Sequence, residues 1–465
     1  MNYLLINVTK GLTPLLTSGC FPPIGLLYIA SSLEAEGHKV EVLDFYCENN
    51  PVEEIKRKIK SFDAIGLNVY SKSIPQINHI ISIIKKINPD IPIIIGGPHC
   101  TFHPEDALID IPADISVEGE AEQSIKDVAK ALTNNSDLSK IPGIYYRKNN
   151  KIKKGRPFKL IKDLDAIKFP SRNLIEKYVY CYGKINKEFF YPPKFTCMMT
   201  SRGCPYRCSF CTRHIVTSTY RKRSAENVIE ELRLIDEKYD TVGMLDDNFL
   251  QDKKRIFKIM DKIIESKIDL NIYIMGARVD SANIDLYKKI KKAGVKYIGF
   301  GIESGNQEII DFYNKKITLK QVVKAVNLAR KMDFLVTGSF ILGAPFETIN
   351  HVKKTMKFAC SLPLDYAVFS PLSYDYGSDI WKDAVKTGKI NEDTDKYAVR
   401  ADSLRGLGNF TTEELTELCK KGMSRFYSRP SYITRKLFTS LLNKDFNAII
   451  SGTDFFYSLY KRQPS

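Results

Sequence analysis

The sequence lacks the features of an exported or membrane-spanning protein. No apolar run approaches the ~20 residues that a helix needs to cross a bilayer. Residues 1–10 form a short apolar stretch without the basic flank and longer apolar core of a signal peptide. No internal repeat or low-complexity stretch is evident in the 465 residues, of which 43% are hydrophobic and 27% charged, as in ordinary globular proteins. We therefore expect a cytoplasmic protein, whose thiols stay reduced.

Acidic residues are in the minority among the charged ones. The chain has 70 Lys and Arg against 54 Asp and Glu, which gives a formal net charge of +16. This excess permits an acidic partner but does not require one, because lysines spread along the chain are typical of solvated helix faces. At this length we expect two to four domains, each with its own core.

The first 145 residues alternate between strand and helix patterns. Their strands are near-continuous apolar runs, which predicts a doubly wound, flavodoxin-like parallel sheet. Ligands of such sheets bind beyond the carboxyl ends of the strands, so the informative loops are 70–73, 96–99 and 118–120. The predicted strands are 3–8, 39–44, 64–69 and 91–95, and the predicted helices are 24–36, 53–60 and 74–87.

Three cysteines stand within eight positions, at Cys204, Cys208 and Cys211. A tight turn lets three thiolates hold one inorganic cluster, and because a closed 4Fe-4S site takes four cysteines, one iron is left open for a cofactor. Two alternatives remain. A zinc site would use His214 as the fourth ligand, whereas a disulfide with one free thiol is not favoured in a chain that nothing marks as secreted.

Strands and helices alternate again from residue 195 to about 375, and each predicted strand ends in polar or glycine-rich residues. Those ends carry Asp246, Arg278, Glu303 and Gly343. This pattern is typical of a barrel, in which loops at the carboxyl ends of parallel strands form the site. We expect residues 146–194 to be a linker broken by proline and residues 376–465 to be a helical C-terminal region.

The C-terminal region mixes Lys and Arg with Phe and Tyr. We expect a helix over 411–427 and a second one over 434–442. One interpretation is a helical cap that packs over the barrel, and the other is a surface for membrane lipid or an extended substrate.

The spacing Cys-x3-Cys-x2-Cys resembles the signature of the radical S-adenosylmethionine enzymes. In that family, Cys204, Cys208 and Cys211 would ligate three irons of a 4Fe-4S cluster, and S-adenosylmethionine would chelate the fourth. The resemblance implies a partial (β/α)6 barrel over residues 195–375.

The same resemblance assigns roles to residues around the cluster. Phe210 stands where the family keeps an aromatic residue beside the adenine, and Arg278 would contact the S-adenosylmethionine carboxylate. Glu303 would contact its ribose or amino group, and the segment 340–343, ending in Gly343, would flank the adenine. A carboxylate at a strand end can equally cap the following helix.

The first domain resembles the cobalamin-binding domain that precedes many radical S-adenosylmethionine domains, on the basis of residues 22–26 and 95–101. Adjacent glycines let backbone approach a bulky ligand. The cofactor residues that the resemblance suggests are Ser71 and Ser73 near the ring or tail, Gly96 and Gly97 against the nucleotide tail, and Glu118 and Gly119 in the third loop.

No Asp-x-His-x-x-Gly motif follows the first predicted strand, where residues 7–11 read Asn-Val-Thr-Lys-Gly. We therefore expect no histidine on the lower face of cobalt. His99 and His103 are expected to be loop histidines whose polar atoms are satisfied by backbone.

These resemblances imply a reaction. A reduced cluster would cleave S-adenosylmethionine to a radical that abstracts hydrogen from an unactivated carbon, and methylcobalamin would then supply a methyl group. We expect C-methylation of a small-molecule or lipid substrate, with an external one-electron donor such as ferredoxin or flavodoxin.

Alternatives are a radical cyclase or rearrangement enzyme of the same family, and a transfer RNA methylthiotransferase. The second matches poorly, since it would carry an additional N-terminal cluster domain and a C-terminal β-barrel, and we do not expect a nucleic acid partner. A cobalamin or iron sensor would leave the barrel and its open-iron cluster unexplained.

Overall fold

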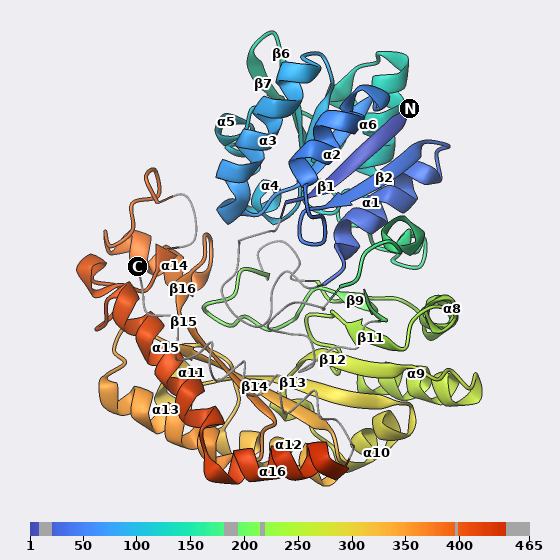
Figure 1. The fold of residues 1–465 in the computed structure, drawn as a ribbon. Helices are drawn as coiled ribbons and strands as arrows, with labels where there is room; N and C mark the ends of the chain where they lie inside the picture. The colour runs from blue at the N-terminus through green and yellow to red at the C-terminus, as the bar shows by residue number, and fades with distance from the viewer. Residues whose placement is uncertain (9–20, 181–193, 214–218, 396–398, 443–465) are drawn as a thin grey trace. The chain divides into compact units, whose positions relative to one another are not determined.

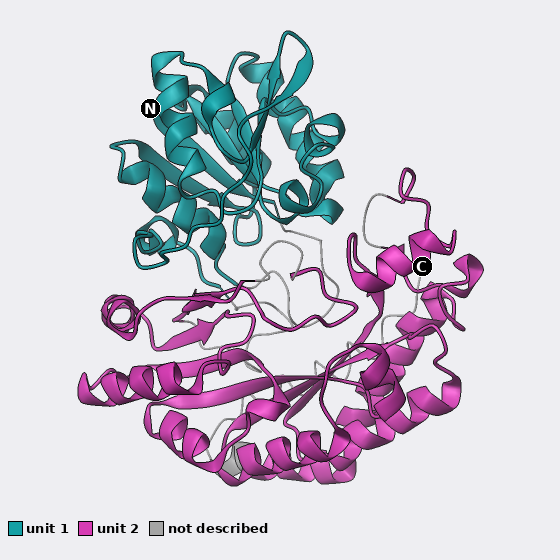
Figure 2. Cartoon of the chain, turned by 180° about the vertical axis from the view of Figure 1, so that it is seen from behind, with its two compact units in different colours: residues 1–180 teal, residues 181–465 magenta. Residues whose placement is uncertain are grey.

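The structure of the protein, a computed structural model, describes residues 1–8, 21–180, 194–213, 219–395 and 399–442. The chain divides into two compact units, Met1–Tyr180 and Cys181–Ser465 (Figure 1 and Figure 2). Each unit is built around its own parallel sheet.

Unit 1 contains a seven-stranded sheet in the order β2-β1-β3-β4-β5-β6-β7. Strands β1 to β5 are parallel, whereas β6 and β7 run antiparallel at one edge. Leu4, Leu5 and Ile6 in β1 are almost completely buried, as expected for a strand covered on both faces. The strands are β1 (Asn2–Asn7), β2 (Lys39–Asp44), β3 (Ala64–Asn68), β4 (Ile93–Gly96), β5 (Ile115–Val117), β6 (Ile144–Lys148) and β7 (Lys151–Lys154).

Helices cover both faces of this sheet. One contacting pair is α1 (Ile24–Glu34) and α6 (Ser124–Asn134), and the other is α2 (Pro51–Lys58) and α3 (Ile74–Ile87). In α3, isoleucines recur at helical spacing on the buried side. The short helices α4 (Pro98–Phe102) and α5 (Ala107–Asp110) follow β4. The predicted doubly wound sheet is confirmed.

The range 146–194, expected as a linker, contains most of β6 and all of β7. The exposed charged residues of β7 give no apolar run, and for this reason the sequence pattern reads as a basic turn. The chain then stays with unit 1 as far as Tyr180, whose hydroxyl donates a 2.9 Å hydrogen bond to Asp44 Oδ2. Ser171 N also donates to Leu27 O at 3.2 Å.

Unit 2 contains six parallel strands in the order β15-β14-β13-β12-β11-β8, which is also their order along the chain. Figure 1 shows α9, α10, α12 and α13 along one side of this curved sheet. The predicted partial (β/α)6 barrel is confirmed. Its strands are β8 (Phe195–Met198), β11 (Thr241–Met244), β12 (Asn271–Ala277), β13 (Val295–Glu303), β14 (Leu335–Leu342) and β15 (Tyr366–Pro371), and the helices between them are α8 (Ala225–Asp236), α9 (Lys253–Glu265), α10 (Ile284–Lys292), α11 (Gln307–Phe312), α12 (Leu319–Lys331) and α13 (Ile349–Ser361).

Among the described residues, three further helices follow the last barrel strand: α14 (Asp379–Lys386), α15 (Thr412–Tyr427) and α16 (Pro430–Leu442). Thr411 caps α15 and forms a reciprocal capping box with Glu414. At the open edge of the sheet, the Tyr427 hydroxyl accepts from Ala367 N at 3.2 Å and donates to Ala367 O at 3.1 Å, which satisfies both backbone groups of this residue in edge strand β15. No helix within the described part of the chain is long and apolar enough to span a membrane.

Candidate active site

The three clustered cysteines follow β8 and β9 (Ser201–Arg202), at the carboxyl end of the first barrel strand. Gly203, with a φ of +87°, starts the turn, because that conformation favours glycine. Cys211 N donates to Cys208 O at 2.9 Å and closes the loop. Cys204, Cys208 and Cys211 are all half-buried. A set of three thiols on one short loop suits an iron-sulfur cluster.

The segment after α11 supports this loop from one side. Ser209 N donates to Tyr313 O, and Ser209 Oγ donates to Phe312 O, both at 3.0 Å. Asn314 Nδ2 donates to Arg207 O at 2.8 Å. The loop is therefore tied through its backbone to the region that follows β13.

Asp246, two residues after β11, binds the segment that leads into the cysteine loop. Its carboxylate accepts hydrogen bonds from Thr200 N at 3.0 Å, from Thr200 Oγ1 at 2.6 Å and from Ser201 Oγ. Arg255 Nη2 donates to Thr200 O at 2.6 Å. The next carboxylate, Asp247, pairs with Arg213. Asp246 thus fixes the strand that carries the cysteines.

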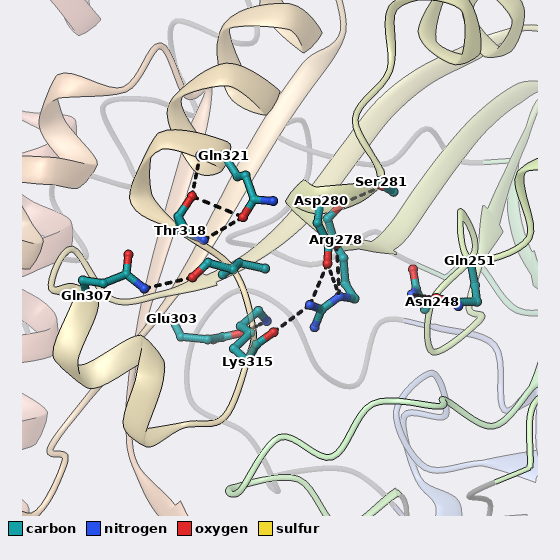
Figure 3. A network of polar contacts seen from close by, with 11 residues as sticks. Asn248, Gln251, Arg278, Asp280, Ser281, Glu303, Gln307, Lys315, Thr318 and Gln321 are labelled. Carbon is teal, nitrogen blue, oxygen red and sulfur yellow. Dashed lines mark hydrogen bonds and ion pairs between the residues drawn. The ribbon is translucent and has the colours of Figure 1, made fainter.

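Arg278 lies beside the cluster loop, with its guanidinium 3.6 Å above the Tyr206 ring. It donates to Asp280 from Nε and Nη2, at 2.8 to 3.3 Å, and to Lys315 O at 2.6 Å (Figure 3). Burial raises the pKa of the Cys208 thiol, and the charges of Lys315 and Arg278 oppose that rise. Both cations therefore favour the thiolate, the form that ligates metal.

Glu303 forms a buried ion pair with Lys315 (Figure 3). Glu303 ends β13 in the left-handed region, with a φ of +68°, which is unusual for a residue with a side chain. A Cβ atom on Gly301 would lie 2.6 Å from Glu303 Oε1 and 2.8 Å from Lys315 Nζ, so glycine there leaves room for the pair. No sequence motif marks Lys315.

The residues expected near the adenine lie in two places. The Phe210 ring packs edge to face on Tyr313, with 5.2 Å between centroids. Gly343, with a φ of +110°, follows β14, and its N–H donates to Glu347 Oε2. A Cβ atom on Gly343 would lie 2.9 Å from Leu415 Cδ1 of α15. The close packing of α15 therefore explains why this position is glycine.

Glu347 was missed by the sequence analysis. Its Oε2 also accepts from Ala344 N at 3.1 Å, so one carboxylate oxygen holds two backbone N–H groups of the loop after β14. Burial raises the pKa of Glu347 to about 7, and the two backbone hydrogen bonds counteract this only in part. The motif Gly343-Ala344-Pro345 marked the loop, but nothing in the pattern marked the acid that holds it.

Within the described residues, no three His, Cys, Asp or Glu side chains form a group that could hold a metal ion. That finding concerns sites around a single ion, such as the zinc alternative. The cysteines of a cluster each bind a different iron. His214, the fourth zinc ligand considered above, lies outside the described residues.

In unit 1, the two serines of the loop after β3 form different hydrogen bonds. Ser73 Oγ donates to Tyr70 O at 2.7 Å and accepts from Tyr70 N at 3.1 Å, so its hydroxyl closes the turn locally. The half-buried Ser71 instead pairs with His99, with 3.1 Å between Oγ and Nδ1. Of these two serines, Ser71 is the one whose hydroxyl is not used within its own turn.

The glycines at this edge also differ. A Cβ atom on Gly96 would meet only Val117, at 3.8 Å or more, so this position has room for a ligand to approach. At Gly97 the φ is +105°, and a Cβ atom would lie 2.3 Å from Asn68 Oδ1. At Gly119 the Phe158 ring occupies the corresponding space. Beside it, burial raises the pKa of Glu118. The open approach at Gly96 fits a bulky cofactor.

Both histidines near this edge are buried. His99 is fully enclosed, and its ring lies 4.9 Å from that of His103. The expectation that His99 is satisfied by backbone needs correction, because its Nδ1 bonds to the Ser71 hydroxyl. After β1, Asn7 donates to Asp44 Oδ1 at 3.1 Å.

Comparisons with known proteins agree with this arrangement. The family model of the radical SAM superfamily matches residues 198–359, and that of the B12 binding domain matches residues 16–129. An uncharacterized methyltransferase of Pyrococcus horikoshii is 33% identical over 423 residues, which cover 90% of each chain. An anaerobic magnesium-protoporphyrin IX monomethyl ester cyclase of Rubrivivax gelatinosus is 26% identical, over 79% of this chain and 67% of its own.

A solved structure shows the same fold. The radical S-adenosylmethionine methyltransferase TsrM of Kitasatospora setae, with tryptophan and a S-adenosylmethionine analog bound, superimposes with a TM-score of 0.69. The match covers 84% of this chain and 77% of that one, at 17% identity.

Proposed function

The chain belongs to the family of cobalamin-dependent radical S-adenosylmethionine enzymes, and from this premise we propose that it transfers a methyl group to an unactivated carbon. One observation carries the proposal. A three-cysteine loop stands on the first strand of a partial barrel, and the same chain holds a doubly wound sheet with an open glycine edge.

The residues have distinct roles in this proposal. Bound to this chain, the cluster and S-adenosylmethionine would supply one-electron chemistry, and cobalamin would supply the methyl group. Cys204, Cys208 and Cys211 hold the cluster by their thiolates. Arg278 and the Glu303–Lys315 pair lie beside that loop and present charges of both signs, which suits a ligand that carries an amino and a carboxylate group.

Methyl transfer is favoured over cyclisation. The Pyrococcus horikoshii relative, which is named a methyltransferase, matches this chain over nearly its whole length and with a higher identity than the Rubrivivax gelatinosus cyclase does. A transfer RNA methylthiotransferase is not favoured either, because unit 1 is a doubly wound sheet and the described C-terminal region is helical.

The partners follow from the chemistry. The substrate we propose is a small molecule or a lipid, and an external one-electron donor such as ferredoxin or flavodoxin would reduce the cluster in the cytoplasm. The test is anaerobic reconstitution with iron, sulfide and cobalamin, followed by mass spectrometry of a metabolite extract incubated with methyl-labelled S-adenosylmethionine. A product that carries the label supports methyl transfer. Deoxyadenosine together with only unlabelled, cyclised or rearranged products would overturn it.

A further inference from the structure

A buried histidine lies next to the hydroxyl of the half-buried Ser71, in the loop after β3. His99 Nδ1 lies 3.1 Å from Ser71 Oγ, and on the other side of the ring His99 Nε2 lies 4.0 Å from Asp110 Oδ2. His99 is fully buried, whereas Ser71 is half-exposed. The three side chains come from three separate elements: the turn after β3, α4 and α5. The fold therefore brings a carboxylate, an imidazole and a hydroxyl into one series that ends at the carboxyl edge of the sheet.

The neighbours of His99 set the direction of its hydrogen bond. Burial lowers the pKa of His99, although Asp110 and Asp106 oppose this, so the ring is neutral near pH 7. A neutral imidazole has one N–H and one acceptor nitrogen. The negative charge of Asp110 favours the proton on the nearer nitrogen, Nε2. Nδ1 is then the acceptor, and the Ser71 hydroxyl must donate its proton to it.

This direction determines what Ser71 can offer a ligand. A serine hydroxyl has one proton and two lone pairs. Because the proton is directed at His99, only the lone pairs can point beyond the edge of the sheet, where ligands of open parallel sheets bind. Ser73, two residues on, uses its hydroxyl both to donate to and to accept from Tyr70. Within this loop, Ser71 is therefore the serine that can serve a ligand, and it serves as an acceptor.

We propose that His99 is a positioning residue for cobalamin, which orients the Ser71 hydroxyl to accept a hydrogen bond from an amide N–H of the corrin side chains. The inference rests on the proposed function and goes further, because it names the part of the cofactor that the protein contacts. An acceptor oxygen cannot bond to the phosphate of the nucleotide tail, which has no proton to give, and a comparison with a corrinoid that lacks the tail separates the tail's ribose hydroxyl from the corrin amides. The amide groups around the corrin ring are donors of the required kind.

The test measures dissociation constants of hydroxocobalamin and of cobinamide, which lacks the nucleotide tail, for the full chain after anaerobic reconstitution. Ser71→Ala should weaken both ligands roughly tenfold, the value of one lost hydrogen bond. His99→Met should have a similar effect, and the double variant should lose no more than either single one, because His99 acts through Ser71. His99→Asn restores an acceptor oxygen near the position of Nδ1 and should recover most of the affinity.

The matched control is Ser124→Ala, which removes a buried 2.8 Å hydrogen bond to Pro142 O and should lower the melting temperature without changing either dissociation constant.

If His99→Met lowers the melting temperature but leaves cobalamin affinity unchanged, His99 is merely structural and the inference is wrong. If the loss occurs with cobalamin but not with cobinamide, Ser71 contacts the tail, and the corrin assignment is wrong. Should His99→Met not fold, Ser71→Ala and His99→Asn carry the test. A wild-type protein that binds neither ligand would instead overturn the cobalamin part of the proposed function.

Discussion

Lys315 Nζ lies 2.5 Å from Glu303 Oε1, and each of the two side chains is only 8% exposed. Breaking a buried pair on one side leaves an uncompensated charge, although replacing both partners together is often tolerated. Glu303 is also held in a left-handed conformation, which a fold retains only where its surroundings enforce it. Substitutions of this pair should therefore affect both the stability of the protein and the candidate site beside the cysteine loop.

Single and double substitutions of this pair should separate the two roles. We expect Glu303→Gln or Lys315→Met alone to lower the free energy of unfolding by about 3–5 kcal/mol. The double variant should regain most of that stability but cleave S-adenosylmethionine at least roughly tenfold more slowly, since it lacks the charges that we propose face the ligand. Urea unfolding and deoxyadenosine formation measure the two effects. Arg330→Met is the control, because it breaks the pair with Asp365 at the amino ends of the strands. Full cleavage by the double variant would argue against a binding role.

Replacement of Cys204, Cys208 or Cys211 by alanine should abolish the brown 4Fe-4S chromophore and all cleavage of S-adenosylmethionine, because we propose that each of these thiolates binds one iron. Visible absorption and iron analysis after anaerobic reconstitution measure the cluster. Cys360→Ser should keep it. Retention of full iron content and activity in any of the three variants would refute the assignment.

Gly96 and Gly97 should respond differently to substitution. Gly97→Ala should destabilise unit 1 by about 1–3 kcal/mol, because its φ is +105° and the new Cβ atom would overlap Asn68 Oδ1. A Cβ atom on Gly96 would meet only Val117, at 3.8 Å or more, and we expect Gly96→Val to leave the melting temperature near the wild-type value.

The same Gly96→Val variant should retain less cobalamin after gel filtration and keep a normal iron content, because the cysteines lie in the other unit. If the variant retains as much cobalamin as the wild type, the ligand does not lie against Gly96. The absorption spectrum of the bound cofactor should show no histidine nitrogen on cobalt.

Glu347 should make stability depend on pH. Its pKa rises from an ordinary value of 4.5 to about 7 on folding, so the native state keeps a proton that the unfolded chain releases between these values. Stability should therefore fall as the pH rises through this window, by an amount on the order of 3 kcal/mol. Glu347→Gln keeps an oxygen for Gly343 N and should lose this dependence.

Urea unfolding at pH 5, 6, 7 and 8 measures the difference between Glu347→Gln and wild type, which should grow with pH. Glu226→Gln is the control. A hydrogen bond from Lys258 lowers the pKa of Glu226 to about 2, so its effect on stability is lost only as the pH falls below about 4.5. A difference that stays constant from pH 5 to 8 for Glu347→Gln would contradict the prediction.

The sequence predicted features that depend on local order. Cysteine spacing predicted the loop that we propose holds the cluster, and apolar runs located both sheets, since burial on two faces leaves a plain pattern. Strand ends identified Arg278 and Glu303. Lys315, in contrast, stands after α11 between Asn314 and Lys316, where a lysine reads as a surface residue.

The remaining differences concern tertiary contacts. The β6–β7 hairpin is charged and exposed at its outer strand, so its pattern resembles a turn. His99 could be recognised as a loop histidine, but which atom it bonds to depends on the fold that brings α4 against the β3 loop. Burial of Glu347 likewise follows from packing that no short motif encodes.

Tyr427 bears on the tendency of the protein to aggregate. Strand β15 is an open edge, and unpaired N–H and C=O groups on such an edge are a template for strands of other molecules. The Tyr427 hydroxyl occupies both groups of Ala367, and α15 lies along the strand. Helix α15 therefore protects the barrel against edge-to-edge aggregation, and a chain truncated before Thr412 should polymerise through β15 even if every residue of the site is intact.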